Sequence, residues 1–109
     1  MTLGITPQGW HVGDLERPLA GTALDGAVPV DLTTATATVA NIRRADGTVI
    51  SRAVTLGNQT TAPGTWTLPW VIGDLSCAGG FSCEVEVTWP GARPQTFGPA
   101  SFQVARAIA

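Results

Sequence analysis

The chain has 109 residues, which is the size of a single domain, with 44% apolar residues, only 13% charged residues and a formal net charge of −2. It contains no lysine and no basic run, so neither nucleic acid nor an anionic membrane is expected as a partner, because both require clustered positive charge. The N-terminus lacks the basic and apolar regions of a secretory signal, and no stretch approaches the ~20 apolar residues of a membrane span. We therefore expect a protein that is made and assembled in a cytoplasm.

The first half of the chain alternates between apolar and polar residues and is interrupted by glycine, proline and aspartate, which is typical of strands and turns. Residues 1–12 are expected to form an N-terminal arm or a short edge strand, and residues 13–109 the folded domain. Within that domain we expect a strand over Pro18–Leu24, a short extended piece around Val28–Leu32 and a longer strand over Ala35–Arg44.

The strand over Ala35–Arg44 has two possible inward faces. Either the odd-numbered side chains around Val39 or the even-numbered ones around Ile42 face the core, and a slip of one residue would invert every side chain. A β-bulge would reconcile the two patterns, and we favour Ile42 as the inward residue. The Asp46-Gly47 pair that follows predicts a tight hairpin turn, and a return strand is expected over Thr48–Leu56.

The second half contains the clearest strands. A strand over Thr65–Val71 is expected to place its two tryptophans and its leucine on one face. The run Phe81–Trp89 alternates strictly between apolar and polar side chains, as in a half-buried antiparallel strand. Closing strands are expected over Pro94–Phe97 and Ser101–Ile108. Together these short strands predict an all-β antiparallel sandwich or small barrel.

The residues that could carry catalytic chemistry are few and scattered. His11 is the only histidine and has no nucleophile motif beside it, so we interpret it as a surface or interface residue. Glu84 and Glu86 share one strand face, where two carboxylates could act as general acid and base, but we favour a solvated strand face. We therefore expect a protein that is not an enzyme.

Two cysteines provide the only thiols of the chain. Cys83 lies on the apolar face of its strand and is interpreted as a small buried hydrophobe, whereas Cys77 lies in the preceding loop. Cysteines of a cytoplasmic protein are usually reduced, although the spacing alone leaves a disulfide between them open. A structural zinc site usually needs four cysteine or histidine ligands, so we expect no metal and no cofactor.

Trp10 differs from the other tryptophans because it lies outside the alternating strands. It could anchor the N-terminal segment on this domain or on a neighbouring molecule, and the sequence leaves both possibilities open. The two chain ends, residues 2–12 and 104–109, are apolar enough to dock on a partner. The candidate interface residues are Ile5, Trp10, His11, Val12, Val104 and Ile108.

Three runs of the chain, taken in order, resemble a known family. They are GDLERPLAGTAL, VPVDLTTATATVANIRRADGTVI and WTLPWVIGDLSCAGGFSCEVEVTWPGARPQTFGPASFQV. From about Gly13 to Val104 the chain is similar to the N-terminal domain of phage upper baseplate proteins. The resemblance implies an immunoglobulin-like antiparallel β-sandwich of about seven to eight strands, which serves as an attachment module and has no catalytic residues.

On that resemblance, the expected function is that of a non-enzymatic structural protein in the tail, baseplate or neck of a tailed-bacteriophage virion. Its partners would be other virion proteins, bound through protein–protein contacts in multiple symmetric copies. It would be located in the virion after assembly in the host cytoplasm. The alternatives are a capsid decoration protein of the same fold, or a carbohydrate- or receptor-binding module for host attachment with an exposed Trp10 or Trp89.

Overall fold

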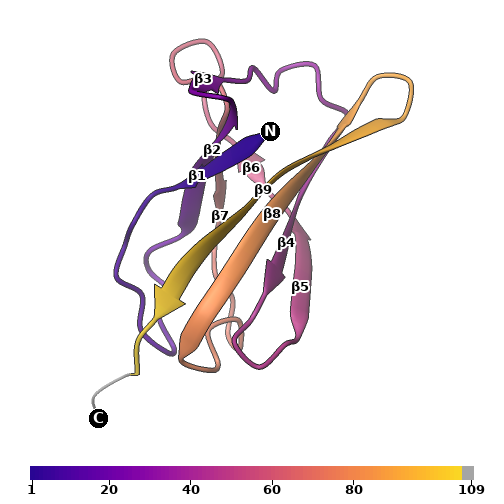
Figure 1. Ribbon diagram of the computed structural model, residues 1–109. Helices are drawn as coiled ribbons and strands as arrows, with labels where there is room; N and C mark the ends of the chain where they lie inside the picture. Colours follow the sequence, from indigo (N-terminus) through magenta and orange to yellow (C-terminus); the bar gives the residue numbers. More distant parts are fainter. Residues whose placement is uncertain (107–109) are drawn as a thin grey trace.

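The structure, a computed structural model, describes residues 1–106 and consists of two antiparallel sheets packed face to face (Figure 1). One sheet has the order β1-β2-β7-β6, with the short β3 paired to β2, and the other has the order β5-β4-β8-β9. The strands of the described chain are β1 (Thr2–Ile5), β2 (Leu19–Asp25), β3 (Val28–Pro29), β4 (Ala37–Arg43), β5 (Val49–Ala53), β6 (Thr55–Leu56), β7 (Thr65–Leu68), β8 (Gly79–Trp89) and β9 (Arg93–Val104).

The expected all-β, immunoglobulin-like sandwich is confirmed, with nine strands over residues 1–106 where seven to eight were expected. Among those same residues, no helix has the length and apolar character needed to cross a bilayer.

The core lies between the two sheets and follows the alternation of the sequence. The expected inward faces of β7 and β8 are confirmed, because the alternate side chains from Phe81 to Val87 are buried, as are Trp66 and Leu68. Trp66 packs across Gly21 of the neighbouring β2, where a Cβ atom would lie only 2.7 Å from Cζ2 of the indole, so a glycine is needed there. The largest fully buried side chains are Trp10, Trp66, Phe81, Phe97, Leu19, Leu32, Ile42 and Leu68, each worth about 1.5–3 kcal/mol of burial.

Strand β4 resolves the ambiguity of its sequence. Ala40 and Ile42 are fully buried and Thr38 is almost so, whereas Val39 is half-buried on the outer face. The preference for Ile42 as the inward residue is therefore confirmed. The pairing of β4 with both neighbours runs without a register shift, so this strand needs no bulge, and the irregularity lies instead between β8 and β9 at Cys83–Val85.

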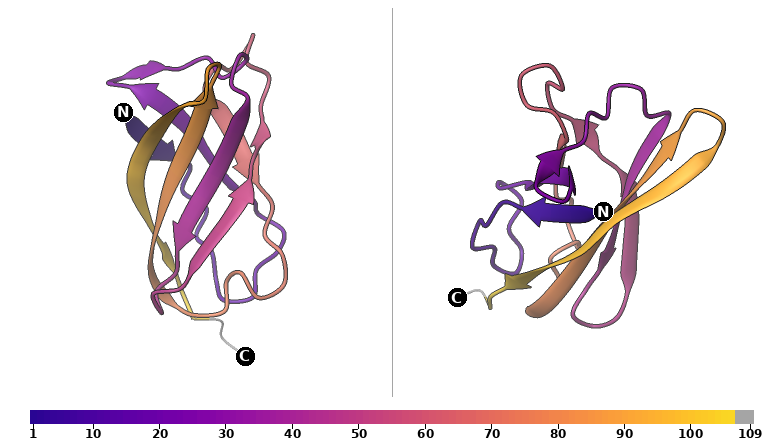
Figure 2. Two further views of the ribbon diagram at one scale, coloured as in Figure 1. Left: turned by 90° about the vertical axis from the view of Figure 1, so that its right-hand side faces the viewer. Right: turned by 45° about the horizontal axis from the view of Figure 1, so that its top comes forward.

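The return strand expected over Thr48–Leu56 is in fact two strands that belong to different sheets. β5 pairs with β4, whereas β6 pairs with β7. The chain crosses between the sheets at Val54, whose amide still donates to the Thr38 carbonyl at 3.1 Å. As a result, β5 is an outer edge of its four-stranded sheet, as the left view of Figure 2 shows beside β4.

The other edge of this sheet is β9, which replaces the two closing strands expected separately. The strand continues through Gly98-Pro99 with a register shift opposite Cys83–Val85, because a bulge lets a strand continue past residues that do not pair regularly. β8 and β9 form the longest hairpin of the fold, and its turn end splays away from the other strands (Figure 2, right).

Candidate interaction surface

The N-terminal segment lies against the edge strand β9. After β1, residues 10–12 reach the end of β9, where they exchange two backbone hydrogen bonds of 2.9 Å with Ala105. Farther along the same edge, the Gly98 amide donates to the Met1 carbonyl at 3.4 Å. We call this region the closed side: the β9 edge together with residues 1 and 10–12.

Trp10 is a core residue of this domain. Its side chain is 2% exposed, and its ring lies edge-on to those of Trp70 and Phe102, with centroid distances of 6.1 Å and 5.0 Å. Its Nε1 donates to the Arg17 carbonyl at 2.8 Å, so the one polar group of the indole is satisfied. The sequence left open whether Trp10 anchors the N-terminal segment on this domain or on a neighbouring molecule. In the structure it anchors the segment on this domain.

The other candidate interface residues differ in exposure. Val104 is 2% exposed and faces the core, whereas Ile5 and Val12 are half-buried and pack against it. His11 is exposed. Ile108 lies outside the described residues. Whether any of these residues contacts a partner stays a prediction.

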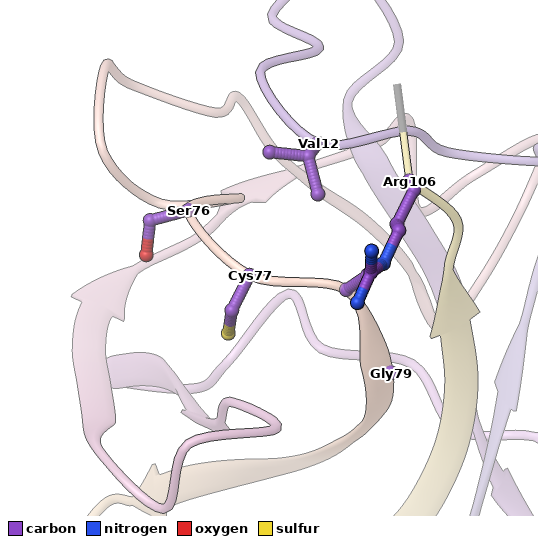
Figure 3. A pocket seen from close by; sticks show the side chains of 6 residues that line it. Val12, Ser76, Cys77, Gly79 and Arg106 are labelled. Carbon is purple, nitrogen blue, oxygen red and sulfur yellow. The ribbon is translucent and has the colours of Figure 1, made fainter. Parts of the chain in front are cut away.

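An open recess of about 630 Å³ lies where the segment before β8 meets the end of β9 (Figure 3). Cys77 presents a free thiol there, but its sulfur points away from the Arg106 guanidinium. Activation of a thiol requires a base or a cation directed at it, and His11 is not among the residues that line the recess. The lining consists of Val12, Ser76, Cys77, Ala78, Gly79 and Arg106.

The other reactive side chains lie apart from this recess. Burial, and secondarily the charge of Glu84, raises the pKa of the Cys83 thiol to about 12. Both cysteines are free, so the disulfide that the sequence left open is not formed. Glu84 and Glu86 are exposed on the outer face of β8. Within residues 1–106, no group of three or more His, Cys, Asp or Glu side chains is placed to hold a metal ion.

An ion pair fixes the segment between β7 and β8 to the edge strand β5. Nη1 and Nη2 of Arg52 each donate to the Asp74 carboxylate at 2.8 Å, and Nη1 also donates to the Pro69 carbonyl at 3.3 Å. Burial alone would raise the pKa of Asp74, but hydrogen bonds from Arg52 and from the Val71 amide hold this pKa below its ordinary value of 3.8. The carboxylate is therefore ionised at neutral pH, and the pair keeps residues 69–74 beside β5.

Three exposed large apolar side chains belong to β5 or to the turn that this ion pair ties to it. Ile72 is 89% exposed and Val71 50% exposed in the turn, and Val49, which begins β5, is 55% exposed. Nη1 of Arg44, just after β4, donates to the Gly73 carbonyl at 2.9 Å, so the turn lies next to the β4–β5 hairpin. We call this region the open side: the β5 edge, Val49–Ala53, together with Val71 and Ile72.

Sequence reasoning placed the candidate contacts at the chain ends and did not identify the open side. The available signal was Val71-Ile72, an apolar pair directly before the Gly73-Asp74 turn, where polar residues are usual. The free edge of β5 was missed because Thr48–Leu56 was treated as one strand. A single strand in one sheet gives no indication that β5 lies at an edge.

Comparisons with known proteins support the fold and identify no family. No family model matches the chain, and neither does any curated protein. The crystal structure of CopC from Methylosinus trichosporium OB3b is similar over 98% of this chain and 97% of CopC, with a TM-score of 0.53 and 12% sequence identity. At this identity the likeness shows a shared fold alone.

The expected role as a structural protein of a tailed-phage virion is wrong on this comparison. The solved structure that matches 98% of this chain is CopC, and not a phage structural protein. The capsid-decoration and host-attachment alternatives belong to the same expectation and are set aside with it. The resemblance to upper baseplate proteins stays a prediction, and it consists mostly of turn and core residues, which a sandwich requires whatever its function.

Proposed function

We propose that this chain is a non-catalytic binding domain that acts through protein–protein contacts on its open side. One observation carries the proposal: an unpaired strand edge coincides with three exposed large apolar side chains, Val49, Val71 and Ile72. Single exposed apolar residues are ordinary on protein surfaces, but an apolar group beside free backbone hydrogen-bonding groups favours association. A partner bound there would remove apolar area from water and pair the strand edge at the same time.

Contacts within the chain hold the open side, which supports a binding role. Two hydrogen bonds of 2.8 Å between Arg52 and Asp74 tie the turn to β5, and β5 is paired along its whole length with β4. A surface that is held in place before binding loses less conformational entropy when a partner arrives. The free energy gained by burying the apolar side chains is then not offset by the entropy cost of ordering a loop.

The distribution of reactive groups supports a non-catalytic role. His11 lies 3.9 Å from Asp14 on the closed side, the Cys77 thiol lies in the recess, and Glu84 and Glu86 lie on the outer face of β8. Acid–base and nucleophilic catalysis require such groups within hydrogen-bond reach of one another or of a common substrate. A binding domain has no such requirement.

Site-specific photo-crosslinking tests the proposal. We expect a chain with p-benzoylphenylalanine in place of Ile72 to form a covalent adduct with a protein when the producing cells are illuminated. The matched control carries the same residue in place of Val28, which is 66% exposed on β3, away from the open side, and should form no adduct. Equal adducts from both positions, or none from position 72, would overturn the proposal.

A further inference from the structure

We propose that the partner on the open side is a second copy of this chain, joined by antiparallel pairing of the two β5 strands about a two-fold axis at Ser51. The inference rests on the proposed function and names its partner. The pairing would join the two four-stranded sheets into one continuous sheet with a closed, symmetric interface.

The backbone groups of β5 face in two directions. At one end of the strand the Arg44 amide donates to the Thr48 carbonyl at 2.8 Å, and at the other the Val54 amide donates to the Thr38 carbonyl at 3.1 Å. In an antiparallel pair, hydrogen-bonded positions alternate with non-bonded ones, so residues 48, 50, 52 and 54 bond to β4. Residues 49, 51 and 53 therefore direct their N–H and C=O groups away from β4, where no other strand of the described chain pairs with them.

These three residues are complementary to themselves about Ser51. With the axis there, Ser51 lies opposite Ser51 of the second copy, and Val49 lies opposite Ala53 of that copy. All three positions become hydrogen-bonded pairs, and each pair exchanges two backbone bonds. A shift of one residue would instead face the free groups with residues whose own groups already bond to β4, so a single register satisfies the whole edge.

The side chains of β5 permit this close approach. Its outward residues, Val49, Ser51 and Ala53, are exposed and uncharged, so no like charges meet across the axis. The one charge of the strand, on Arg52, is neutralised by Asp74 of the same copy. Strands that avoid pairing carry lysine, proline or an uncompensated charge at their free edge, and β5 carries none of these.

Ile72 provides the pairing with an apolar border. The hydrogen bond from Arg44 to the Gly73 carbonyl places the turn beside the Val49 end of β5. The two-fold axis brings the Ala53 end of the second copy to that same place. An isoleucine that is 89% exposed in one chain would then be covered by the other.

Two variants and a matched control test this pairing in the purified full chain. Ser51→Pro removes the central N–H, which does not bond to β4, and proline is tolerated at a strand edge when its missing donor faces outward. Ile72→Asp places a charge on the border, and Val28→Asp makes the same kind of change on β3. By sedimentation velocity over a concentration series, we expect the native chain and Val28→Asp to dimerise, and Ser51→Pro and Ile72→Asp to weaken the dimer about ten- to a hundredfold.

Amide hydrogen exchange provides a second measurement that needs no variant. Exchange at residues 49, 51 and 53 should slow as the native chain is concentrated, whereas exchange at residues 50 and 52, already bonded to β4, should not change. A native chain that stays monomeric at about millimolar concentration, or a dimer that Val28→Asp weakens as much as Ile72→Asp does, would overturn the inference. If the position-72 probe crosslinks only to a different polypeptide, the self-pairing fails while the proposed binding function stands.

Discussion

The two edge strands of the four-stranded sheet, β9 and β5, differ in length, in proline content and in their contacts with other segments. β9 is twelve residues long, contains Pro94 and Pro99, and lies against residues 1 and 10–12. β5 is five residues long, contains no proline, and leaves the outward groups of alternate residues without a partner in the described chain. A long, exposed strand edge is a template for uncontrolled association. The N-terminal segment bonds to the β9 edge at Gly98 and Ala105, whereas the short β5 edge has no such contact within the described chain.

The two sides are also stabilised by different interactions. The closed side depends on aromatic packing, in which Trp10 lies edge-on to Trp70 and Phe102. The open side depends on one ion pair, between Arg52 and Asp74, which leaves Val71 and Ile72 exposed. The comparison therefore predicts that changes on the closed side affect mainly folding, and changes on the open side mainly association.

The largest effect is expected from Trp10→Ala on the closed side. Removing a fully buried indole deletes its contacts with two aromatic rings and leaves a cavity, which should lower the free energy of unfolding by about 3–5 kcal/mol. Urea denaturation followed by circular dichroism measures the change. Val28→Ala, at an exposed position, should change stability by less than about 0.5 kcal/mol. If both variants were equally mild, the closed side would not depend on Trp10, and the contrast between the edges would be lost.

An intermediate effect is expected from Arg52→Gln on the open side. The buried Asp74 carboxylate would keep the Val71 amide as a donor but would lose two charged hydrogen bonds, which should destabilise the chain by about 1–3 kcal/mol at neutral pH. Denaturant titration measures the loss. An unchanged midpoint would mean that the turn is not held by this ion pair.

The pH dependence of the stability difference between the native chain and Arg52→Gln provides a control for this prediction. Because the pKa of Asp74 in the folded chain lies below 3.8, the unfolded chain takes up the proton first as the pH falls. The contribution of the pair is therefore complete above pH 3.8 and is lost as the pH falls through the lower, folded pKa. The stability difference between the native chain and Arg52→Gln should accordingly shrink in acid. A difference that stays constant to low pH would show that the ionised pair is not its source.

The smallest effect is expected at the turn where β9 begins. Ala92 has a φ of +56°, in the left-handed region that costs an L-residue about 1–2 kcal/mol. Ala92→Gly should remove that strain at the expense of greater flexibility in the unfolded chain, for a net gain of about 0.5–1 kcal/mol in thermal or urea unfolding. A loss of stability would mean that the Ala92 methyl group makes packing contacts that outweigh the strain.

Sequence reasoning identified the strands with strict alternation. It failed where the chain passes from one sheet to the other between two neighbouring strands. The inward faces of β7 and β8 follow from the period of two, since large apolar residues recur at every second position. The return strand after Gly47 has the same local pattern on both sides of Val54, so nothing local marks the change of sheet. The function expected from family resemblance was wrong, because turn and core residues specify a sandwich and not what it binds.

The sequence alone predicted the all-β architecture, the inward-facing residues of β7 and β8 and the hairpin at Asp46-Gly47, because these depend on alternation and turn chemistry over a few residues. The tertiary structure alone decided that Trp10 joins the core, that Arg52 meets Asp74 and that β5 ends at a free edge. Each of these depends on which distant segments lie side by side. That arrangement is set by the packing of the whole domain, which no local pattern encodes.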